Sequence, residues 1–502
     1  MSNRGHPLAQ LAGLVGGRLR PAGANAVVSG IQQDSRRVVA GDLFVALRGA
    51  TTDGMRFLPM ARERGAVAVL VEAGRGESVA DLPVLEVETP RRALAELAAE
   101  LNGRPSEELN VLGLTGTNGK TTGAHLLQQA LGPDRTGIVG TLGYRFGALD
   151  RRASHTSPEA DVVQSVLGDM RDRGAAYVAM EVSSIALAAE RVHAVRFVGA
   201  LFTNLSQDHL DYHGSMAAYA AAKDALFTAF APPAMALNLD DAHGAELHAR
   251  LRAERPDATA LGYGLDPQAD VTAEALSTER GITMTVVGPN GRNAIRSNLV
   301  GAHNVENLLG VMALIEALAH AEVVTVDDVA RAAENLSRPA AIPGRLERCD
   351  GPDDDLVAVV DYAHTPDALA RILESLRPLT TGKVWCVFGC GGDRDSDKRG
   401  PMGAAVAAGA DVAIVTNDNP RSESPEAIAD AVVAGLDGAR HYQVELDRSA
   451  AIAMAVDQAE SGDVVLVAGK GHEPYQIIGD RTLDFDDRVT LRNALRRRRE
   501  GA

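Results

Sequence analysis

The sequence predicts an α/β protein of about three domains, and three observations support this prediction. Short apolar runs alternate along the whole chain with stretches suited to helices. The 502 residues are too many for one ordinary core, because domains commonly hold roughly 100 to 200 residues. The 50 glycines and an aromatic content of only 4% suit an α/β enzyme better than an all-β module.

The charge balance argues against two classes of partner. The chain carries 50 basic and 67 acidic residues, for a net charge of -17, so we expect no general binding to nucleic acid or to anionic membranes. No apolar run approaches about 18 residues, and the first residues lack a clear cleavage site. Three cysteines without a metal-type spacing indicate reduced thiols, so we expect a cytoplasmic protein without membrane insertion.

Residues 1–107 are expected to form the first domain, a small α/β unit. A helix from Pro90 to Leu101 followed by Asn102-Gly103-Arg104-Pro105 marks its end. Two polar turns, around Ser35 and from Gly49 to Gly54, flank the second of its strands, although surface turns of this kind need have no ligand. Its predicted strands are 26–31, 42–47 and 66–71, with a helix at 55–64 between the last two.

Residues 108–340 are expected to form a central domain that begins with a phosphate-binding loop, Val111 to Thr122. The apolar run at its start suits a buried strand, and Gly116 and Gly119 allow backbone N–H groups to face phosphate oxygens. Lys120 supplies a cation and Thr121 a hydroxyl for Mg²⁺. A strict phosphate-loop signature would have glycine where Leu114 stands, so the match is to a variant of that motif.

Two further strands of the central domain end in polar side chains. The run 176–182 has Glu181 near its end, and the run 198–204 leads into a loop that contains His209. Because the carboxyl ends of parallel strands line the ligand crevice, both side chains are expected near a bound metal and phosphate. Asn304 opens a long helix that runs to about Leu318, where it serves either as a helix cap or as a reader of a purine edge.

Residues 341–502 are expected to form a third, Rossmann-like α/β domain. A Pro/Gly-rich linker at 337–345 separates it from the central domain. Four apolar runs each enter a polar loop, which places the loops along one edge of an open sheet. These runs are 357–361, 384–388, 412–416 and 464–468.

Six motifs in order along nearly the whole chain resemble those of the Mur ligases of peptidoglycan synthesis, among them the type that adds the third residue of the stem peptide. The motifs are Gly116-Thr117-Asn118-Gly119-Lys120-Thr121-Thr122, Met180-Glu181-Val182-Ser183-Ser184, Thr203-Asn204-Leu205-Ser206-Gln207-Asp208-His209-Leu210-Asp211, His303-Asn304-Val305-Glu306-Asn307, Asp361-Tyr362-Ala363-His364-Thr365-Pro366 and Gly469-Lys470-Gly471-His472-Glu473.

The resemblance implies an ATP- and Mg²⁺-dependent ligase that adds meso-diaminopimelate to UDP-MurNAc-L-Ala-D-Glu through an acyl phosphate, working as a monomer. It implies a UDP-binding first domain, an ATPase central domain and an amino-acid-binding last domain. By the same analogy the catalytic residues are Lys120, Glu181, His209 and a carbamoylated Lys223, with Thr121, Glu181 and His209 as metal ligands. The analogous ATP-binding residues are Gly116, Thr117, Asn118, Gly119, Lys120, Thr121, Thr122, Asn304, Arg345 and Asp361.

The other two substrates are assigned from the resemblance as well. Ser35, Thr156, Ser157, Ser183 and Arg191, together with the loop from Gly49 to Gly54, match the surface for the UDP-MurNAc-dipeptide. Arg394, Asp418, Asn419, Pro420, Arg421, Gly469 and Glu473 match the diaminopimelate site. In that site the two arginines face a distal carboxylate that lysine lacks. The chain departs from the family at Ile185, Ala189 and Ser157, which affects the details of dipeptide contact.

Three alternatives remain open from the residues alone. A lysine-adding Mur ligase shares all of the ATP chemistry. A folylpolyglutamate synthase shares the phosphate loop but neither the first domain nor the run from Asp418 to Arg421. A nucleotide-dependent switch protein explains Val111 to Thr122 but gives no reason for four converging C-terminal loops.

Overall fold

The computed structural model describes residues 5–49, 52–79, 81–153, 155–278, 281–339 and 342–501. Ala50 and Thr51 of the predicted ligand loop, Ser154 and the predicted boundary between 340 and 341 lie outside this range. The chain divides into two compact units, which we describe separately. Unit 1 comprises residues 1–273, 286–293 and 306–335, and unit 2 comprises 274–285, 294–305 and 336–502.

The first part of unit 1 contains a five-stranded sheet in the order β2-β7-β6-β5-β4. Four of its strands are parallel, and β2 is antiparallel to β7. The strands are β2 (Arg18–Arg20), β4 (Gly30–Gln32), β5 (Asp42–Val45), β6 (Ala68–Glu72) and β7 (Val84–Val87), and β1 (His6–Pro7) pairs with β3 (Val27–Val28). The helices are α1 (Leu8–Leu14), α2 (Leu58–Glu63) and α3 (Pro90–Leu101), with 3-10 turns at Gly54–Phe57, Gly76–Ser78 and Pro105–Glu107.

An eight-stranded sheet in the order β11-β10-β9-β12-β8-β13-β14-β15 forms the centre of unit 1. Its strands are β8 (Asn110–Thr115), β9 (Thr136–Gly140), β10 (Gly143–Phe146), β11 (Leu149–Arg151), β12 (Tyr177–Glu181), β13 (Phe197–Phe202), β14 (Ala234–Asn238) and β15 (Thr259–Tyr263). Only β10 runs against the others, because β11 is antiparallel to β10 and therefore has the direction of β9. Glu181 pairs in register with Leu114, and Phe202 with Thr115, so the strands on either side of β8 end at the same edge as β8.

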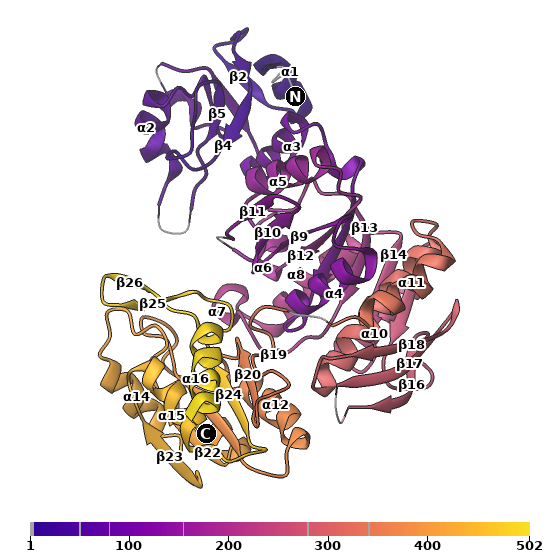
Figure 1. Ribbon diagram of the computed structural model, residues 1–502. Coiled ribbons are helices and arrows are strands. Elements are labelled where there is room, and N and C mark those ends of the chain that lie inside the picture. The colour runs from indigo at the N-terminus through magenta and orange to yellow at the C-terminus, as the bar shows by residue number, and fades with distance from the viewer. Residues whose placement is uncertain are drawn as a thin grey trace. The chain divides into compact units, whose positions relative to one another are not determined.

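Helices connect these parallel strands. They are α4 (Lys120–Leu131), α5 (Ala160–Asp172), α6 (Ser184–Ala188), α7 (Leu210–His213), α8 (Met216–Thr228) and α9 (Ala242–Glu254). Ser183, Ser215 and Asp241 begin α6, α8 and α9, and each side chain accepts a backbone N–H of the first turn. Figure 1 shows α3 and α5 side by side, and the two helices are in contact.

Residues 272–336 supply the remaining elements before the last domain. Strands β16 (Thr272–Ser277), β17 (Ile282–Gly288) and β18 (Gly291–Ser297) form a three-stranded sheet, and α10 (Ala302–His320) and α11 (Val326–Leu336) follow. The two units divide this stretch between them. The predicted helix that starts near Asn304 is confirmed as α10.

The body of unit 2 is a six-stranded sheet in the order β19-β20-β24-β21-β22-β23. Its strands are β19 (Glu347–Arg348), β20 (Val357–Asp361), β21 (Val384–Phe388), β22 (Val412–Val415), β23 (His441–Val444) and β24 (Val464–Ala468), and all but β19 are parallel. The four predicted strands of this region are therefore neighbours, and their carboxyl ends meet at one edge. Separate apolar clusters cover the two faces of the sheet.

The helices of unit 2 are α12 (Pro366–Leu376), α13 (Arg399–Gly409), α14 (Pro425–Val433), α15 (Arg448–Gln458) and α16 (Asp487–Gly501), with a 3-10 turn at Arg377–Leu379. A hairpin of β25 (Tyr475–Ile478) and β26 (Arg481–Asp484) precedes α16. Figure 1 shows α15 and α16 side by side, in agreement with their contacts. These sheets confirm the predicted α/β class.

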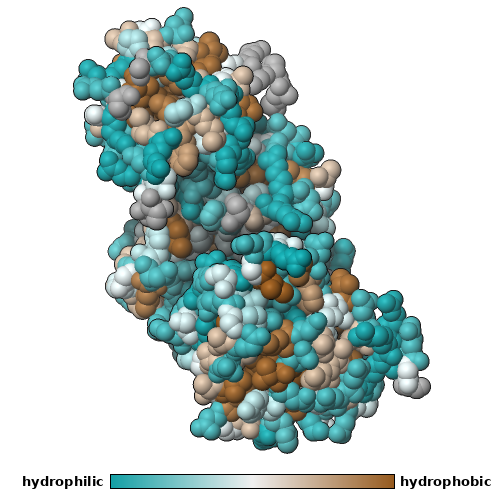
Figure 2. Space-filling model, turned by 90° about the vertical axis from the view of Figure 1, so that its left-hand side faces the viewer, coloured by the Kyte–Doolittle hydropathy of each residue, from teal (hydrophilic) through white to brown (hydrophobic). Residues whose placement is uncertain are grey.

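Hydrophilic residues cover most of the face shown in Figure 2, with smaller apolar groups between them. Tyr442 and Val444, on the edge strand β23, are among the large apolar side chains that stay about half exposed, at 49% and 48%. None of the helices in the described part of the chain is long and apolar enough to cross a membrane.

Candidate functional site

The loop between β8 and α4 follows a path that requires glycine at two positions. Gly116 and Gly119 have φ values of +146° and +86°. A Cβ atom at Gly116 would lie 1.9 Å from Thr203 Oγ1, and one at Gly119 would lie 2.5 Å from Asn307 Oδ1. The loop therefore packs directly against the end of β13 and the side chain of Asn307, with the N-terminus of α4 immediately after it.

Hydrogen bonds fasten this loop to the segment that follows β13. The backbone N–H of Asn118 donates to Asn204 Oδ1 at 3.0 Å, and Thr117 Oγ1 donates to Ser206 O at 3.1 Å. The phenol of Tyr219 lies 3.1 Å from Thr117 Oγ1. Burial raises the pKa of Tyr219 to about 12, so this phenol keeps its proton at neutral pH.

Two lysines converge on one carbonyl oxygen of the loop. Lys120 Nζ donates to Gly116 O at 2.8 Å, and Lys223 Nζ, from α8, donates to the same atom at 2.7 Å. Lys223 is 1% exposed, and its ammonium also lies 4.4 Å from the centre of the Tyr219 ring. Burial and the positive charge of Lys120 lower the pKa of Lys223 well below its ordinary value. This buried amine therefore loses its proton far more readily than a surface lysine.

Glu181, at the end of β12, is held through both carboxylate oxygens. Thr121 Oγ1 donates to Glu181 Oε2 at 2.9 Å. Thr141 donates to the same carboxylate twice, from its N–H at 2.9 Å and from its hydroxyl at 3.1 Å. The structure thus brings the predicted metal ligands Thr121 and Glu181 into contact.

The donor set around Glu181 suits a hard cation such as Mg²⁺. A carboxylate and a hydroxyl are oxygen ligands, and Mg²⁺ commonly binds through one or two protein oxygens and completes its shell with water and phosphate. In the described ranges no group of three or more His, Cys, Asp and Glu side chains is arranged to hold a metal. An ion here would therefore take most of its ligands from nucleotide and water.

His209 lies at the N-terminus of α7 with a left-handed φ of +51°. Its side chain is 44% exposed, and its Nε2 atom is 3.5 Å from an oxygen of Asp208. The imidazole packs edge-on against Tyr219, with 6.2 Å between the ring centres. Tyr219 also contacts Thr117 of the phosphate loop, so the Tyr219 ring lies between His209 and that loop.

Three of the predicted dipeptide-binding residues are linked by hydrogen bonds to Thr141 or to the backbone of Glu181. Thr156 Oγ1 lies 3.0 Å from Thr141 Oγ1, and Ser157 Oγ donates to the backbone oxygen of Glu181 at 2.8 Å. The backbone N–H of Ser183 donates to Ser157 Oγ at 2.9 Å.

The other two predicted dipeptide-binding residues, Arg191 and Ser35, make different contacts. Arg191 donates to Ser157 O at 3.1 Å and forms an ion pair of 2.7 Å with Glu159. Ser35, in the turn between β4 and β5, donates its hydroxyl to Met60 Sδ at 3.4 Å.

Sequence reasoning missed Thr141. The residue follows β9, whose sequence Thr-Gly-Ile-Val-Gly is weakly apolar and contains two glycines. Its position just beyond the carboxyl end of a strand was the signal that could have found it, because Glu181 was recognised on that basis.

In unit 2 the predicted nucleotide-binding residues Asp361 and Arg345 lie at the carboxyl end of β20. Asp361, at the end of β20, accepts N–H groups from Leu346 and Ala363, each at 2.7 Å. Burial raises the pKa of Asp361 above its usual range. The guanidinium of Arg345 lies over the Tyr362 ring at 4.9 Å.

Asn304, the remaining predicted adenine contact, sits near the start of α10. Its side chain donates to Val300 O at 2.8 Å. Asn304 lies inside the first turn of α10, which begins at Ala302, so it does not precede the helix as a cap residue does. Its role as a reader of a purine edge stays a prediction.

The loops after β22 and β24 meet around a buried lysine. Lys470 Nζ lies 3.3 Å from Asp418 Oδ1 and 3.0 Å from Asn419 Oδ1. Glu473 Oε2 is 3.5 Å from the same ammonium and accepts a hydrogen bond of 3.0 Å from Asn419 Nδ2. Gly469 has a φ of +117°, and a Cβ there would contact Asp418. Lys470 was not predicted as a site residue, although it stands inside a quoted motif.

Arg421 is fixed mainly through its backbone. Its N–H donates to Ile477 O at 3.1 Å, and its carbonyl accepts from Gly479 N at 2.7 Å. The guanidinium donates to Gly392 O at 2.7 Å. The loop of Gly392 continues into Arg394, whose side chain is exposed. The structure therefore brings Arg421 onto the loop that carries Arg394.

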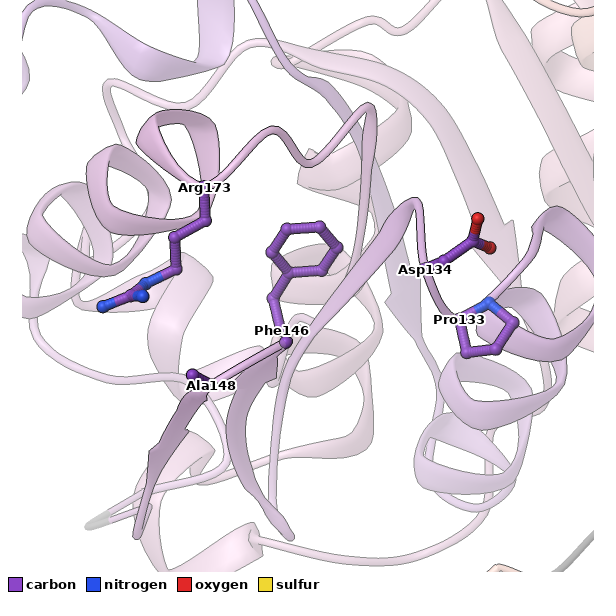
Figure 3. A pocket seen from close by; sticks show the side chains of 6 residues that line it. Pro133, Asp134, Phe146, Ala148 and Arg173 are labelled. Carbon is purple, nitrogen blue, oxygen red and sulfur yellow. The ribbon is translucent and has the colours of Figure 1, made fainter.

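A separate pocket of about 510 Å³ (Figure 3) lies at the edge of the eight-stranded sheet that is opposite the carboxyl ends of its parallel strands. Because β10 runs against β9, Phe146 at its end lies at the edge where the parallel strands begin. None of its lining residues belongs to the predicted site. They are Pro133, Asp134, Phe146, Gly147, Ala148 and Arg173.

Three family models match consecutive parts of the chain. The Mur ligase family catalytic domain model matches residues 27–101, and the Mur ligase middle domain model matches 114–315. The Mur ligase glutamate ligase domain model matches 344–471.

The chain is similar along its length to known proteins. A protein of Gloeobacter violaceus named UDP-N-acetylmuramoyl-L-alanyl-D-glutamate--2,6-diaminopimelate ligase is 44% identical over 94% of both chains. A solved structure with the same name superposes with a TM-score of 0.67 and 33% identity, covering 99% of each chain. The MurF ligase of Thermotoga maritima in complex with ADP reaches a TM-score of 0.60, covering 93% of this chain and 98% of that one, and its 18% identity supports the fold alone.

Proposed function

The chain belongs to the Mur ligase family, and we propose that it is the ATP-dependent ligase that joins meso-diaminopimelate to UDP-MurNAc-L-Ala-D-Glu. The observation that carries the proposal is the 44% identity, over 94% of both chains, to a relative with that printed name.

The proposed reaction has two steps. The D-glutamate carboxylate of the nucleotide substrate attacks the γ-phosphorus of ATP, and ADP leaves. The amine of diaminopimelate then attacks the acyl phosphate, the amide forms, and phosphate and a proton leave. Both steps require cations beside anionic reactants and a free amine held against the activated carbonyl.

The proposed phosphate site belongs to unit 1. Gly116, Thr117, Asn118, Gly119 and Thr122 would present the N-terminus of α4 and the loop backbone to ATP. Lys120 would move its ammonium from the loop carbonyls to the β- and γ-phosphates.

Thr121, Glu181 and His209 are proposed as the protein ligands for Mg²⁺. Bound Mg²⁺ would neutralise charge on the transferred phosphoryl group. The contact of 2.9 Å between Thr121 and Glu181 supports this assignment.

We propose carbamoylation for Lys223. Two ammonium groups on the carbonyl oxygen of Gly116 repel one another, and the lowered pKa of Lys223, caused by burial and by Lys120, favours its neutral amine. Only a neutral amine adds CO₂. The resulting carbamate is an anion, so the repulsion from Lys120 would become attraction.

The remaining assignments follow the same proposal. Ser35, Thr156, Ser157, Ser183 and Arg191 would bind UDP-MurNAc-dipeptide. The hydrogen bonds from Ser157 to Glu181 and from Ser183 to Ser157 support a dipeptide position next to the phosphoryl-transfer site. In unit 2, Asn304, Arg345 and Asp361 would bind the adenosine and phosphate parts of ATP.

Diaminopimelate is proposed to bind at the loops after β21, β22 and β24. Arg394 and Arg421 would pair with its distal carboxylate and Glu473 with its distal ammonium. Asp418, Asn419, Pro420 and Gly469 would shape the site. Lysine has no distal carboxylate, so a lysine-adding enzyme would leave both arginines without a substrate partner.

The proposal also covers organisation and location. We propose that residues 1–107, 108–340 and 341–502 act as UDP-binding, ATP-binding and amino-acid-binding domains of a cytoplasmic monomer. The three cysteines are free and buried, which is consistent with a reducing compartment.

Phosphate release with omitted substrates tests the function. We expect release from ATP only when UDP-MurNAc-L-Ala-D-Glu and meso-diaminopimelate are both present. L-lysine in place of diaminopimelate separates the two ligase types. Release without either acceptor, or equal rates with lysine, would contradict the proposal.

A further inference from the structure

Lys470 is a fully buried cation at the centre of the loops after β22 and β24. Its side chain is 0% exposed, and its ammonium lies 3.0 Å from Asn419 Oδ1, 3.3 Å from Asp418 Oδ1 and 3.5 Å from Glu473 Oε2. Tyr475 closes the site, with its ring centre 5.7 Å from the ammonium. A buried cation is stable only when such partners surround it.

Asn419 connects this cation to Glu473. Its side-chain oxygen accepts from Lys470 and from Ile477 N, at 3.0 and 2.9 Å. That arrangement fixes the amide so that its nitrogen donates to Glu473 Oε2 at 3.0 Å. Lys470 thus contacts Glu473 directly and also orients the side chain that holds it.

Several charged and titratable groups face Glu473. Burial raises the pKa of Glu473, the Asp418 carboxylate raises it further, and the Lys470 ammonium lowers it. Arg448 also acts on Glu473, but Arg448 is bound at 2.7 Å to Asp487 in a pair that is 0% exposed on both sides. The phenols of Tyr362 and Tyr475 are the other neighbours. Lys470 is therefore the cation in contact with Glu473 that compensates the charge of Asp418.

We propose that Lys470 is a positioning residue for the amino-acid substrate: it keeps Glu473 ionised and correctly oriented to bind the distal ammonium. This inference rests on the proposed function and extends it to a residue that would not touch substrate. Asp418 and Glu473 carry two negative charges and Lys470 one positive charge, so the cluster has one net negative charge for an incoming ammonium. Without Lys470, the carboxylates of Asp418 and of the partly buried Glu473 would repel each other without a cation between them, which favours proton uptake by Glu473.

Two variants separate charge from hydrogen bonding. Lys470→Met keeps most of the volume and removes the cation, and Lys470→Gln keeps a donor for Asn419 without charge. We expect KM for diaminopimelate to rise in both as the pH falls, with the acid limb of kcat/KM moved to higher pH by about 1 to 3 units. KM for ATP should not change. The acid limb of kcat/KM measured with ATP as the varied substrate should stay at its wild-type pH.

Two control variants, Glu473→Gln and Lys383→Met, fix the interpretation. Glu473→Gln should remove the acid limb of kcat/KM for diaminopimelate, which would assign this limb to Glu473. The titration of diaminopimelate itself is the same in every variant and cannot cause a difference between them. Lys383→Met, which breaks an exposed ion pair of 3.0 Å with Glu460, should keep the wild-type profile. If Lys470→Met does not fold, Lys470→Gln carries the test.

The outcomes distinguish the two proposals. A wild-type limb in both Lys470 variants, together with diaminopimelate-dependent turnover, would overturn the positioning role and leave the proposed function intact. A wild-type protein without diaminopimelate-dependent turnover would overturn the proposed function and this inference with it.

Discussion

Units 1 and 2 each contain a fully buried lysine, and the two lysines have opposite surroundings. Lys470, in unit 2, lies among Asp418, Asn419 and Glu473. Lys223, in unit 1, donates to the backbone oxygen of Gly116, which also accepts a hydrogen bond from Lys120. Lys223 forms no ion pair with any of the described residues. Burial is the same for both, so the neighbours decide the chemical state.

The difference explains how one residue type can do two kinds of chemistry in one chain. A cation removed from water stays charged where carboxylates compensate it, and loses its proton where they do not. Lys470, which contacts Asp418, Asn419 and Glu473, is thus suited to hold these side chains in place. Lys223, whose pKa burial and Lys120 lower, is suited to react as an amine.

Removal of Lys120 is expected to have the largest effect. Lys120→Ala deletes the proposed cation at the phosphates, and loss of such a group commonly costs on the order of 100-fold to 1,000-fold in rate. It also removes one of the causes that lower the pKa of Lys223, so this pKa should rise in the variant. Phosphate release measures the loss, and near-normal turnover would exclude the phosphate role.

Labelling with ¹³C-bicarbonate tests the two lysines directly. We expect a carbamate signal from Lys223, absent in Lys223→Met, and turnover of that variant lower by about 100-fold. Because only the neutral amine reacts, the signal should fade as the pH falls, but at a lower pH than for an ordinary lysine, since the pKa of Lys223 is lowered by burial and Lys120. A carbamate signal from Lys470 instead would contradict the different chemical roles assigned to the two lysines.

Arg421→Ala tests the amino-acid side of the comparison. Loss of a charged partner in a desolvated contact commonly costs about 2 to 5 kcal/mol, so KM for diaminopimelate should rise on the order of 30-fold or more. KM for ATP should change little. An unchanged affinity for the amino acid would contradict the specificity argument.

Thr141→Val is expected to have the smallest effect. It removes one hydroxyl bond to Glu181 and keeps the backbone bond, so a loss of about 1 kcal/mol, or roughly fivefold in turnover, should follow. Thr228→Val, which removes a bond within α8, is the matched control. Identical kinetics for the two variants would show that the Thr141 hydroxyl is dispensable.

Local patterns predicted most of the fold. The helix Pro90–Leu101 and the strands Val384–Phe388 and Val464–Ala468 have the bounds expected from the sequence. Strand ends also pointed to Glu181, because a polar side chain after an apolar run needs only neighbouring residues to be recognised.

The parts that sequence reasoning missed depend on distant contacts. Lys470 meets Asn419 across 51 residues, and Thr141 meets Glu181 across 40. Nothing in the residues beside Lys470 distinguishes a compensated buried cation from a surface lysine. For residues 244–298 the sequence favoured sheet and connections without delimiting the strands, because exposed positions in β16 and β18 weaken the apolar pattern.

Arg421 holds a left-handed φ of +52°, which favours glycine, asparagine or aspartate over arginine. Its backbone is bonded to Ile477 and Gly479, so the hairpin supports that conformation whatever side chain is present. Under neutral drift the position would be expected to lose its arginine. A lineage that changed its amino-acid substrate could therefore exchange this side chain without rebuilding the loop, and persistence of arginine at 421 would record continued selection for an acidic substrate end.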